Sequence, residues 1–377
     1  MSHVTVIGAG LVGLATAFEL TERGADVTVV DPAPAGQATH FAGGMLAPVA
    51  EVQYRQEPLY PLMLDSAVRY PDLVERVSAA TDLPTGHRTD GTLVVAADRA
   101  DATHLAELAA HQSAHEMTVE RITVREARRL EPGLSPNLAG AVSIPGDHEV
   151  APRQFAEALI DALRSRGVEF VAEKATALIR AAGGDPEAAV TAVRTESHTL
   201  PVADGDSVVL AAGLGASEIE GVHAPLQLRP VYGDILIAAA PHGEELITRV
   251  VRGFVEDRPI YLIPRAEGRI AIGATSREDH RADTPLFAVR DLLRDACRVA
   301  PCLEEAGMVE WGTGARPGTP DDLPYLGREG ENLVISTGYF RHGILLTALG
   351  AAVGAEMALG AEAPELIAAC DPRRARR

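Results

Sequence analysis

Cysteine is scarce in this 377-residue chain, and its three cysteines, Cys297, Cys302 and Cys370, are odd in number. Their spacing matches neither a metal site nor a redox pair, so a disulfide framework is excluded and a reducing compartment is indicated. The sequence also lacks the charged start and cleavage site of a signal peptide. No window of about twenty residues is apolar enough to span a bilayer. These absences predict a cytoplasmic protein without a membrane partner.

Positive charge is also in short supply. The chain has 34 Lys and Arg residues against 53 Asp and Glu residues, which gives a net charge of −19. A strong negative charge argues against nucleic acid as a partner. Apolar residues make up 46% of the chain, so it is globular, and its length allows two or three domains of about 150 residues.

The N-terminal segment has the pattern of a nucleotide-binding βαβ unit. The apolar run 4–7 predicts a buried parallel strand and leads into Gly8, Gly10 and Gly13, which form G-x-G-x-x-G. A helix pattern follows over 11–20, and a second strand over 27–30 ends in Asp31. Strand, helix, second strand and acid are all in place, which favours nucleotide binding over a merely structural unit.

Each of these residue types has a physical reason. Gly8 lets the chain turn sharply, Gly10 lets a pyrophosphate touch the backbone, and Gly13 lets helix and strand pack closely. The helix N-terminus offers N–H groups and a partial positive charge to phosphates. The carboxylate of Asp31 would accept hydrogen bonds from a ribose and repel a 2′-phosphate. The long loop 32–51 is either an extension of this cofactor site or a plain surface loop.

The rest of the chain alternates between two kinds of pattern. Strands at 168–172 and 207–215 suit the first, parallel sheet, and strands at 175–182 and 188–195 flank a turn at 183–187. Short strands at 226–240, 247–252, 260–263 and 269–272 predict an antiparallel sheet, and therefore a second domain. Helices are predicted over 59–70, 71–81, 101–116, 151–166 and 284–299, whereas 310–320 is glycine-rich.

Three histidines on the predicted helix 101–116 are candidate metal ligands. His104, His111 and His115 are spaced by seven and four residues and could share one face. No carboxylate or cysteine completes a recognisable pattern, so a solvated helix face is favoured and no metal site is predicted.

A third glycine-led element lies near the C-terminus. The strand 333–337 runs through Gly338 into a helix expected to begin near Gly343 and to end at about Gly360. A helix N-terminus can stabilise negative charge developing on a redox ring. Together with the glycines that end the strand 207–215, among them Gly213, this arrangement suits FAD better than NAD.

Four motifs give the chain a recognisable resemblance. YLIPRAEGRIAIGAT (261–275), ARPGTPDDLPYLG (315–327), STGYFRHGILL (336–346) and AGGML (42–46) resemble the D-amino-acid oxidase superfamily of FAD-dependent oxidoreductases. Within it the sequence is most similar to the bacterial glycine oxidases of thiamine biosynthesis. The resemblance implies an α/β fold in which a Rossmann-like FAD domain, with a parallel sheet and a β-meander, carries a second, antiparallel-sheet substrate domain. The implied boundaries are 1–85, 146–222 and 311–377 for the FAD domain, and 86–145 and 223–310 for the substrate domain.

The resemblance also assigns roles to residues. Arg316 matches the arginine that pairs with the substrate carboxylate, Tyr261 the tyrosine whose hydroxyl supports it, and Arg341 an arginine at the substrate and flavin site. From the residues alone, Arg316 could instead form a loop salt bridge, Tyr261 could be a core tyrosine, and Arg341 could bind flavin, substrate or neither. The expected FAD contacts, including the glycines of the fingerprint, are Gly8, Gly10, Leu11, Val12, Gly13, Asp31, Pro32, Ala38, Thr39, Gly43, Gly44, Met45, Thr176, Gly213, Gly338, Tyr339, Phe340, His342, Gly343, Ile344 and Leu345.

The implied reaction is oxidative deamination of glycine, with sarcosine and small D-amino acids as further candidate substrates. A hydride passes from Cα to flavin, the imine gives glyoxylate and ammonia or feeds thiazole synthesis, and O₂ is reduced to H₂O₂. A dehydrogenase with another electron acceptor and a non-catalytic flavin-binding subunit are the alternatives. FAD is expected to be non-covalent because 311–317 lacks cysteine, and a homotetramer is implied. His40, Phe41 and Tyr232 depart from the family pattern.

Overall fold

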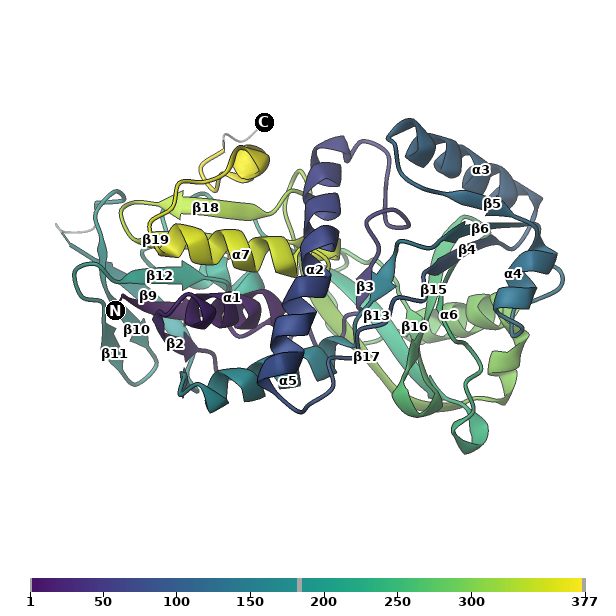
Figure 1. Ribbon diagram of the computed structural model, residues 1–377, viewed down its shortest axis with the longest axis horizontal. Coiled ribbons are helices and arrows are strands. Elements are labelled where there is room, and N and C mark those ends of the chain that lie inside the picture. Colours follow the sequence, from purple (N-terminus) through teal and green to yellow (C-terminus); the bar gives the residue numbers. More distant parts are fainter. Residues whose placement is uncertain (1, 182–184, 375–377) are drawn as a thin grey trace.

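A mostly parallel sheet forms one half of the computed structural model, which describes residues 2–181 and 185–374 (Figure 1, left). Its strand order is β18-β19-β12-β1-β2-β8, and β18 alone in this sheet runs antiparallel to its neighbour. The strands are β1 (His3–Ile7), β2 (Asp26–Val30), β8 (Glu169–Val171), β12 (Ser207–Leu210), β18 (Tyr325–Glu329) and β19 (Leu333–Thr337). The run of buried β-branched residues in β1 and β2 is typical of strands covered on both faces.

Helices cover this sheet and share one large apolar core with it. They are α1 (Leu11–Glu22), α2 (Tyr60–Ala80), α5 (Pro152–Ser165) and α7 (Thr347–Ala358). Helices α1 and α7 are buried along almost their whole length and pack on each other, and α2 and α5 lie outside them. A three-stranded meander of β9 (Ala175–Arg180), β10 (Val190–Thr195) and β11 (Thr199–Pro201) follows. The expected turn 183–187 falls partly outside the described residues.

An eight-stranded sheet forms the other half (Figure 1, right), in the order β17-β13-β16-β15-β14-β4-β6-β5. All neighbours are antiparallel except β4 and β14. The strands are β4 (Thr92–Ala96), β5 (Glu120–Ile122), β6 (Gly140–Ile144), β13 (Arg229–Ala239), β14 (Val250–Val255), β15 (Arg258–Arg265), β16 (Arg269–Gly273) and β17 (Gly307–Gly318). Its helices are α3 (Arg99–Ala114), α4 (Val124–Leu130) and α6 (Leu286–Val299), and a small pair, β3 (Met45–Leu46) and β7 (His148–Glu149), lies near it.

Three local predictions were wrong. The two helices expected at 59–70 and 71–81 are one helix, α2, because its buried face continues past Pro71 through Leu73, Val74 and Val77, and this packing outweighs the lost backbone hydrogen bond. The glycine-rich segment 310–320 is mostly strand β17, so the domain boundary expected at 311 falls inside one strand. The last long helix begins at Thr347, after a short turn that includes Gly343.

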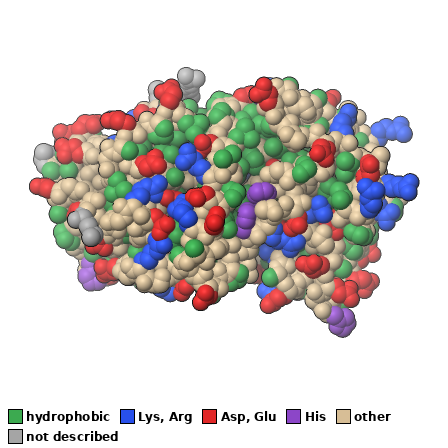
Figure 2. Space-filling view, viewed as in Figure 1, with side chains coloured by type: hydrophobic (Ala, Val, Ile, Leu, Met, Phe, Trp, Pro, Cys, Tyr) green, Lys and Arg blue, Asp and Glu red, His purple; other side chains and the backbone are tan. Residues whose placement is uncertain are grey.

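On the face shown in Figure 2, basic side chains are interspersed with acidic ones. Among the described residues, no helix has the length and apolarity that crossing a membrane would require.

Candidate functional site

A cavity of about 930 Å³ lies where the two halves meet. Its walls include the carboxyl ends of β1, β2 and β12, the loop 32–45, and parts of β15 and β17. Ligands of parallel α/β sheets bind at this end of the strands. The size is at the upper end of the range for small-molecule pockets, roughly 300–1,000 Å³, and therefore suits a large cofactor together with a small substrate.

The fingerprint glycines shape one end of the cavity. Gly8 has φ +102°, and a Cβ on Gly13 would come within 1.9 Å of the Gly8 carbonyl oxygen, so both positions require glycine for the turn and its packing. A Cβ on Gly10 would meet only the Thr39 hydroxyl, at 3.6 Å, and would otherwise project into open space. Gly10 therefore leaves room for a ligand to approach the backbone, as the sequence predicted.

Two side chains hold this turn in place. The Thr39 hydroxyl accepts a hydrogen bond from the Leu11 amide at 3.1 Å, at the start of α1. The Asp31 carboxylate accepts from the amides of Ala9 and Ala33, each at 2.7 Å. Asp31 also lines the cavity, and its oxygens have further lone pairs available for ribose hydroxyls.

The structure brings nearly all the expected cofactor residues to this one cavity. Gly13 is behind the wall, where it packs against Gly8. Thr176 is not on the wall either: its hydroxyl donates to the Arg194 carbonyl, and the neighbouring Ala175 lines the cavity instead. All three residues expected at the substrate, Tyr261, Arg316 and Arg341, line the cavity.

Arg316 has an unusual environment. Its guanidinium lies against Gly233, where a Cβ would come within 2.3 Å of it, and donates to the Thr275 carbonyl at 3.2 Å. No carboxylate of the described residues forms a salt bridge with Arg316, and burial lowers the pKa of this guanidinium. A desolvated positive charge without a counter-ion is costly, so the site favours an anionic ligand.

Tyr261 supplies a second donor in the same part of the cavity. Its phenol packs against Gly273 and Gly43, and a Cβ on Gly43 would lie 3.0 Å from its hydroxyl oxygen. Burial raises the pKa of Tyr261, so the hydroxyl keeps its proton and can donate a hydrogen bond. An arginine and a tyrosine hydroxyl together match the hydrogen-bonding capacity of a carboxylate.

The sequence reasoning missed two charged residues of the wall, Glu51 and Arg252. They form a buried ion pair, and the Glu51 carboxylate also lies 3.8 Å from Arg341. Burial is the largest single influence on Glu51 and raises its pKa, but the nearby positive groups, Arg252 first and then Arg341, together outweigh it and bring the pKa to about 2. Arg341 further donates to the Gln53 amide oxygen at 2.6 and 3.3 Å, with the amide assigned so that its oxygen faces the guanidinium.

One of the departures from the family pattern has a structural explanation. Phe41 covers β17, where a Cβ on Gly312 or Gly314 would clash with its ring, so these glycines and the phenylalanine fit each other. Asp234 is fully buried and pairs with Arg277 at 2.8 Å. Tyr232 bonds through its backbone to Arg277.

His342 is buried close to the charged side chains of Glu51, Arg252 and Arg341. Burial lowers its pKa to about 4, so the imidazole is neutral at neutral pH. Its Nε2 atom has no hydrogen-bond partner among the described residues, although the side chain is on the cavity wall. A buried polar atom of this kind is usually satisfied by a ligand or water.

Comparison with known proteins identifies the family. A profile described as FAD dependent oxidoreductase (DAO) matches residues 3–357. The chain belongs to this family. A glycine oxidase from Geobacillus kaustophilus is 30% identical over 93% of this chain and 91% of its own length. A crystal structure of glycine oxidase from the same species superposes with a TM-score of 0.88 at 28% identity, covering 100% of both chains.

Another relative is longer. The bifunctional protein ThiO/ThiG of Synechocystis is 33% identical over 99% of this chain, but the chain spans only 54% of that protein, about half its length.

Family membership confirms the resemblance and the α/β fold expected from the sequence, as well as the expected class, an FAD-dependent oxidoreductase. The cavity fits the cofactor. The backbone at Gly10, where a ligand can approach closely, lies at one end, and the hydrogen-bond donors Arg316 and Tyr261 line the same cavity.

Proposed function

We propose that this protein is an oxidase of glycine, and of similarly small amines such as sarcosine or small D-amino acids. Glycine would give an imine, which water hydrolyses to glyoxylate and ammonia, while O₂ is reduced to H₂O₂, and the imine can instead supply thiamine thiazole synthesis. Relatives named glycine oxidase and ThiO/ThiG support this choice of substrate and role. A homo-oligomer, as the resemblance implies, is part of the proposal.

The observation that carries the proposal is that no carboxylate of residues 2–181 and 185–374 forms a salt bridge with Arg316. Other cavity arginines already have a carboxylate partner: Arg252 pairs with Glu51, and Arg277 pairs with Asp234. The bare guanidinium and the Tyr261 hydroxyl are therefore the groups best suited to hold the carboxylate of an amino acid.

The chain's residues would bind and orient the substrate. Arg316 would grip the carboxylate bidentately and Tyr261 would donate a further hydrogen bond to it, which fixes the direction of Cα. Arg341 would remain held against the wall by Glu51 and Gln53. When bound, FAD supplies the two-electron acceptor. Residues 8–13, 31–45, 213 and 338–345 would hold the cofactor.

The two halves of the fold would divide these tasks. We infer that the parallel sheet, built from 1–85, 146–222 and the C-terminal segment, carries FAD. The antiparallel sheet, built from 86–145 and 223–310 and extended by β17, would carry the substrate site. Arg316 belongs to β17, which is paired with β13 throughout, so the substrate arginine would lie on the substrate sheet.

Anaerobic mixing of the FAD-loaded protein with a panel of small amino acids tests the proposal. Glycine or sarcosine should bleach the flavin absorbance, and admission of air should restore the colour and produce peroxide. Bleaching without peroxide would favour the dehydrogenase alternative. No bleaching by any amino acid, with FAD bound, would favour a non-catalytic flavin-binding subunit.

A further inference from the structure

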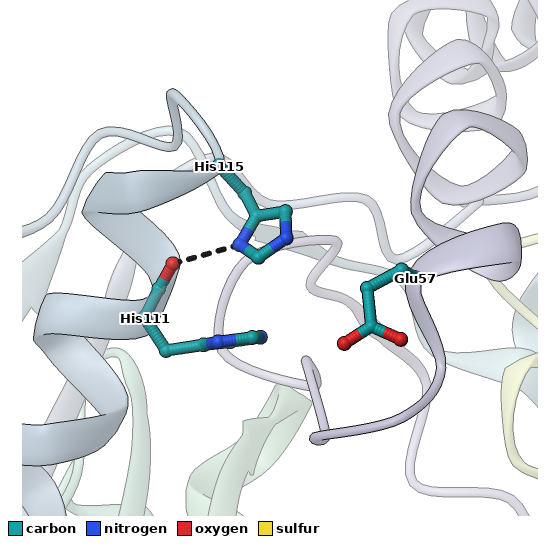
Figure 3. Close-up of side chains that lie close together, drawn as sticks. All are labelled: Glu57, His111 and His115. Atoms are coloured by element: carbon teal, nitrogen blue, oxygen red, sulfur yellow. Dashed lines mark hydrogen bonds between the residues drawn. The ribbon is translucent and has the colours of Figure 1, made fainter.

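Two of the three histidines of helix α3 meet a carboxylate from another part of the chain (Figure 3). Glu57 is in the short helix η1 (Glu57–Leu59), directly before α2, and His111 and His115 are in the last turn of α3 and at its C-terminal cap. One potential ligand atom from each residue lies within 4.8 Å of the other two. In Figure 3 both imidazole rings and the carboxylate face a common space.

The backbone sets the proton position on one of these rings. The Nδ1 atom of His115 lies 2.9 Å from the carbonyl oxygen of His111. A carbonyl can only accept, so Nδ1 must carry the hydrogen, and the Nε2 atom of His115 is left with its lone pair. Metal-binding histidines in proteins usually have this arrangement, in which the second nitrogen donates to a backbone carbonyl or carboxylate.

The neighbouring side chains hold both rings in position. The rings of His111 and His115 contact each other at a tilt of 52° with centroids 4.4 Å apart, and Tyr54 packs on His111 with centroids 4.7 Å apart. The Tyr60 hydroxyl lies 3.0 Å from His111 Nε2 and donates to the Gln53 carbonyl. A site with pre-positioned ligands loses less entropy when it binds.

We propose that Glu57, His111 and His115 form a binding site for a divalent transition metal, with zinc as the best match. Two imidazoles and one carboxylate are a donor set that zinc prefers, and water can fill the remaining position because Glu57 is exposed. The sequence predicted no metal here, since Glu57 is 54 residues before His111 and their spacing follows no pattern.

The metal would connect the two halves of the molecule. Helix α3 packs on β4 and β6 of the antiparallel sheet, whereas α2 packs on α7 and α5 of the other half. The cluster is also linked to the cavity: Tyr60 donates to the Gln53 carbonyl, and the Gln53 amide contacts Arg341. We therefore expect metal binding to stabilise the arrangement of the two halves.

Zinc titration of the tag-free, FAD-loaded full chain by calorimetry tests the proposal. The expected result is saturable binding at a single site, weakened at least about tenfold by Glu57→Gln and by His115→Ala. Zinc should also raise the Tm of the wild-type protein but not that of Glu57→Gln. Because Glu57 is exposed, Glu57→Gln should fold normally, so weaker zinc binding by this variant would not be due to misfolding.

His104 provides the matched control. It is on the same helix but bonds to Asp257 at 2.9 Å and is not part of the cluster. His104→Ala should therefore bind zinc like the wild type. Absence of saturable binding, binding unchanged in Glu57→Gln and His115→Ala, or an equal loss in His104→Ala would each overturn the proposal.

Discussion

Replacement of Arg316 is the sharpest test of the substrate site. In Arg316→Leu the cavity keeps its shape but loses the guanidinium that has no counter-ion among the described residues. Removing one partner of a buried charge pair costs about 3–5 kcal/mol. At about 1.36 kcal/mol per tenfold, kcat/KM for glycine should fall by a factor between about 10² and 10⁴.

The fold should tolerate this change. In the absence of substrate, Arg316 makes one hydrogen bond to a backbone carbonyl, and no salt bridge to it is formed by the described residues. The loss of that bond costs about 1 kcal/mol, and removal of the desolvated charge opposes this loss, so Tm should not fall appreciably and the flavin absorbance should be retained. Arg316→Lys keeps the charge but not the bidentate geometry, so its kcat/KM should be intermediate.

Steady-state peroxide formation, with glycine varied in air, measures the effect. Arg298→Leu is the control, because Arg298 pairs with Glu256 at 2.8 Å and is not among the cavity residues. It should leave kcat/KM within about threefold of the wild type. An Arg316→Leu variant that retains FAD and oxidises glycine at the wild-type rate would refute the carboxylate-binding role.

Four further predictions concern the cavity and the residues packed behind its wall. Tyr261→Phe should lower kcat/KM by roughly 10- to 100-fold, since a hydrogen bond to a charged group contributes about 1.5–3 kcal/mol; an unchanged value in the peroxide assay would show that the hydroxyl does not meet the substrate. Gly10→Val should weaken FAD binding, because the valine side chain would occupy the space next to the backbone where the cofactor would lie. Its fold, measured by circular dichroism, should persist. Gly13→Val should instead prevent folding, since even a Cβ there would meet Gly8; if both variants behave alike, the two assigned roles are wrong. Glu51 has a pKa lowered from 4.5 to about 2, so its contribution to stability is fully present above about pH 4.5 and is lost as the pH falls towards 2. The difference in unfolding free energy between wild type and Glu51→Gln, measured by denaturant titration, should therefore shrink over that range, and a difference that grows would contradict the assigned ion pair.

The sequence predicts best those features that depend on adjacent residues. The turn at Gly8, the close packing at Gly13 and the strand that ends in Asp31 are consequences of local sterics and hydrogen bonding, and all three are present. The three expected substrate residues also come to one cavity, but the resemblance, rather than any periodicity, indicated them.

Features that depend on distant partners were not predictable in this way. The glycines of β17 give no strand pattern, although the segment is a strand of twelve residues. Gly312 and Gly314 are needed there because they make room for Phe41, which is far away in the sequence. Glu51 has no motif of its own and becomes notable only through Arg252, with which it forms a buried ion pair. Glu57 likewise gains its significance from two histidines of another helix.

The charges of the cavity distinguish its structural arginines from Arg316, the arginine that we propose binds a ligand. A buried guanidinium that already has a carboxylate is part of the protein's own stability, and Arg252 and Arg277 are of this kind. Among the described residues Arg316 hydrogen-bonds only to a backbone carbonyl, and Glu51 and Asp234 act on it without forming a salt bridge, so no carboxylate in contact offsets its desolvation. A small carboxylate that enters this space gains the full interaction, whereas an amine without an acid group does not. Selectivity for amino acids over simple amines should therefore disappear in Arg316→Leu, together with most of the activity towards glycine.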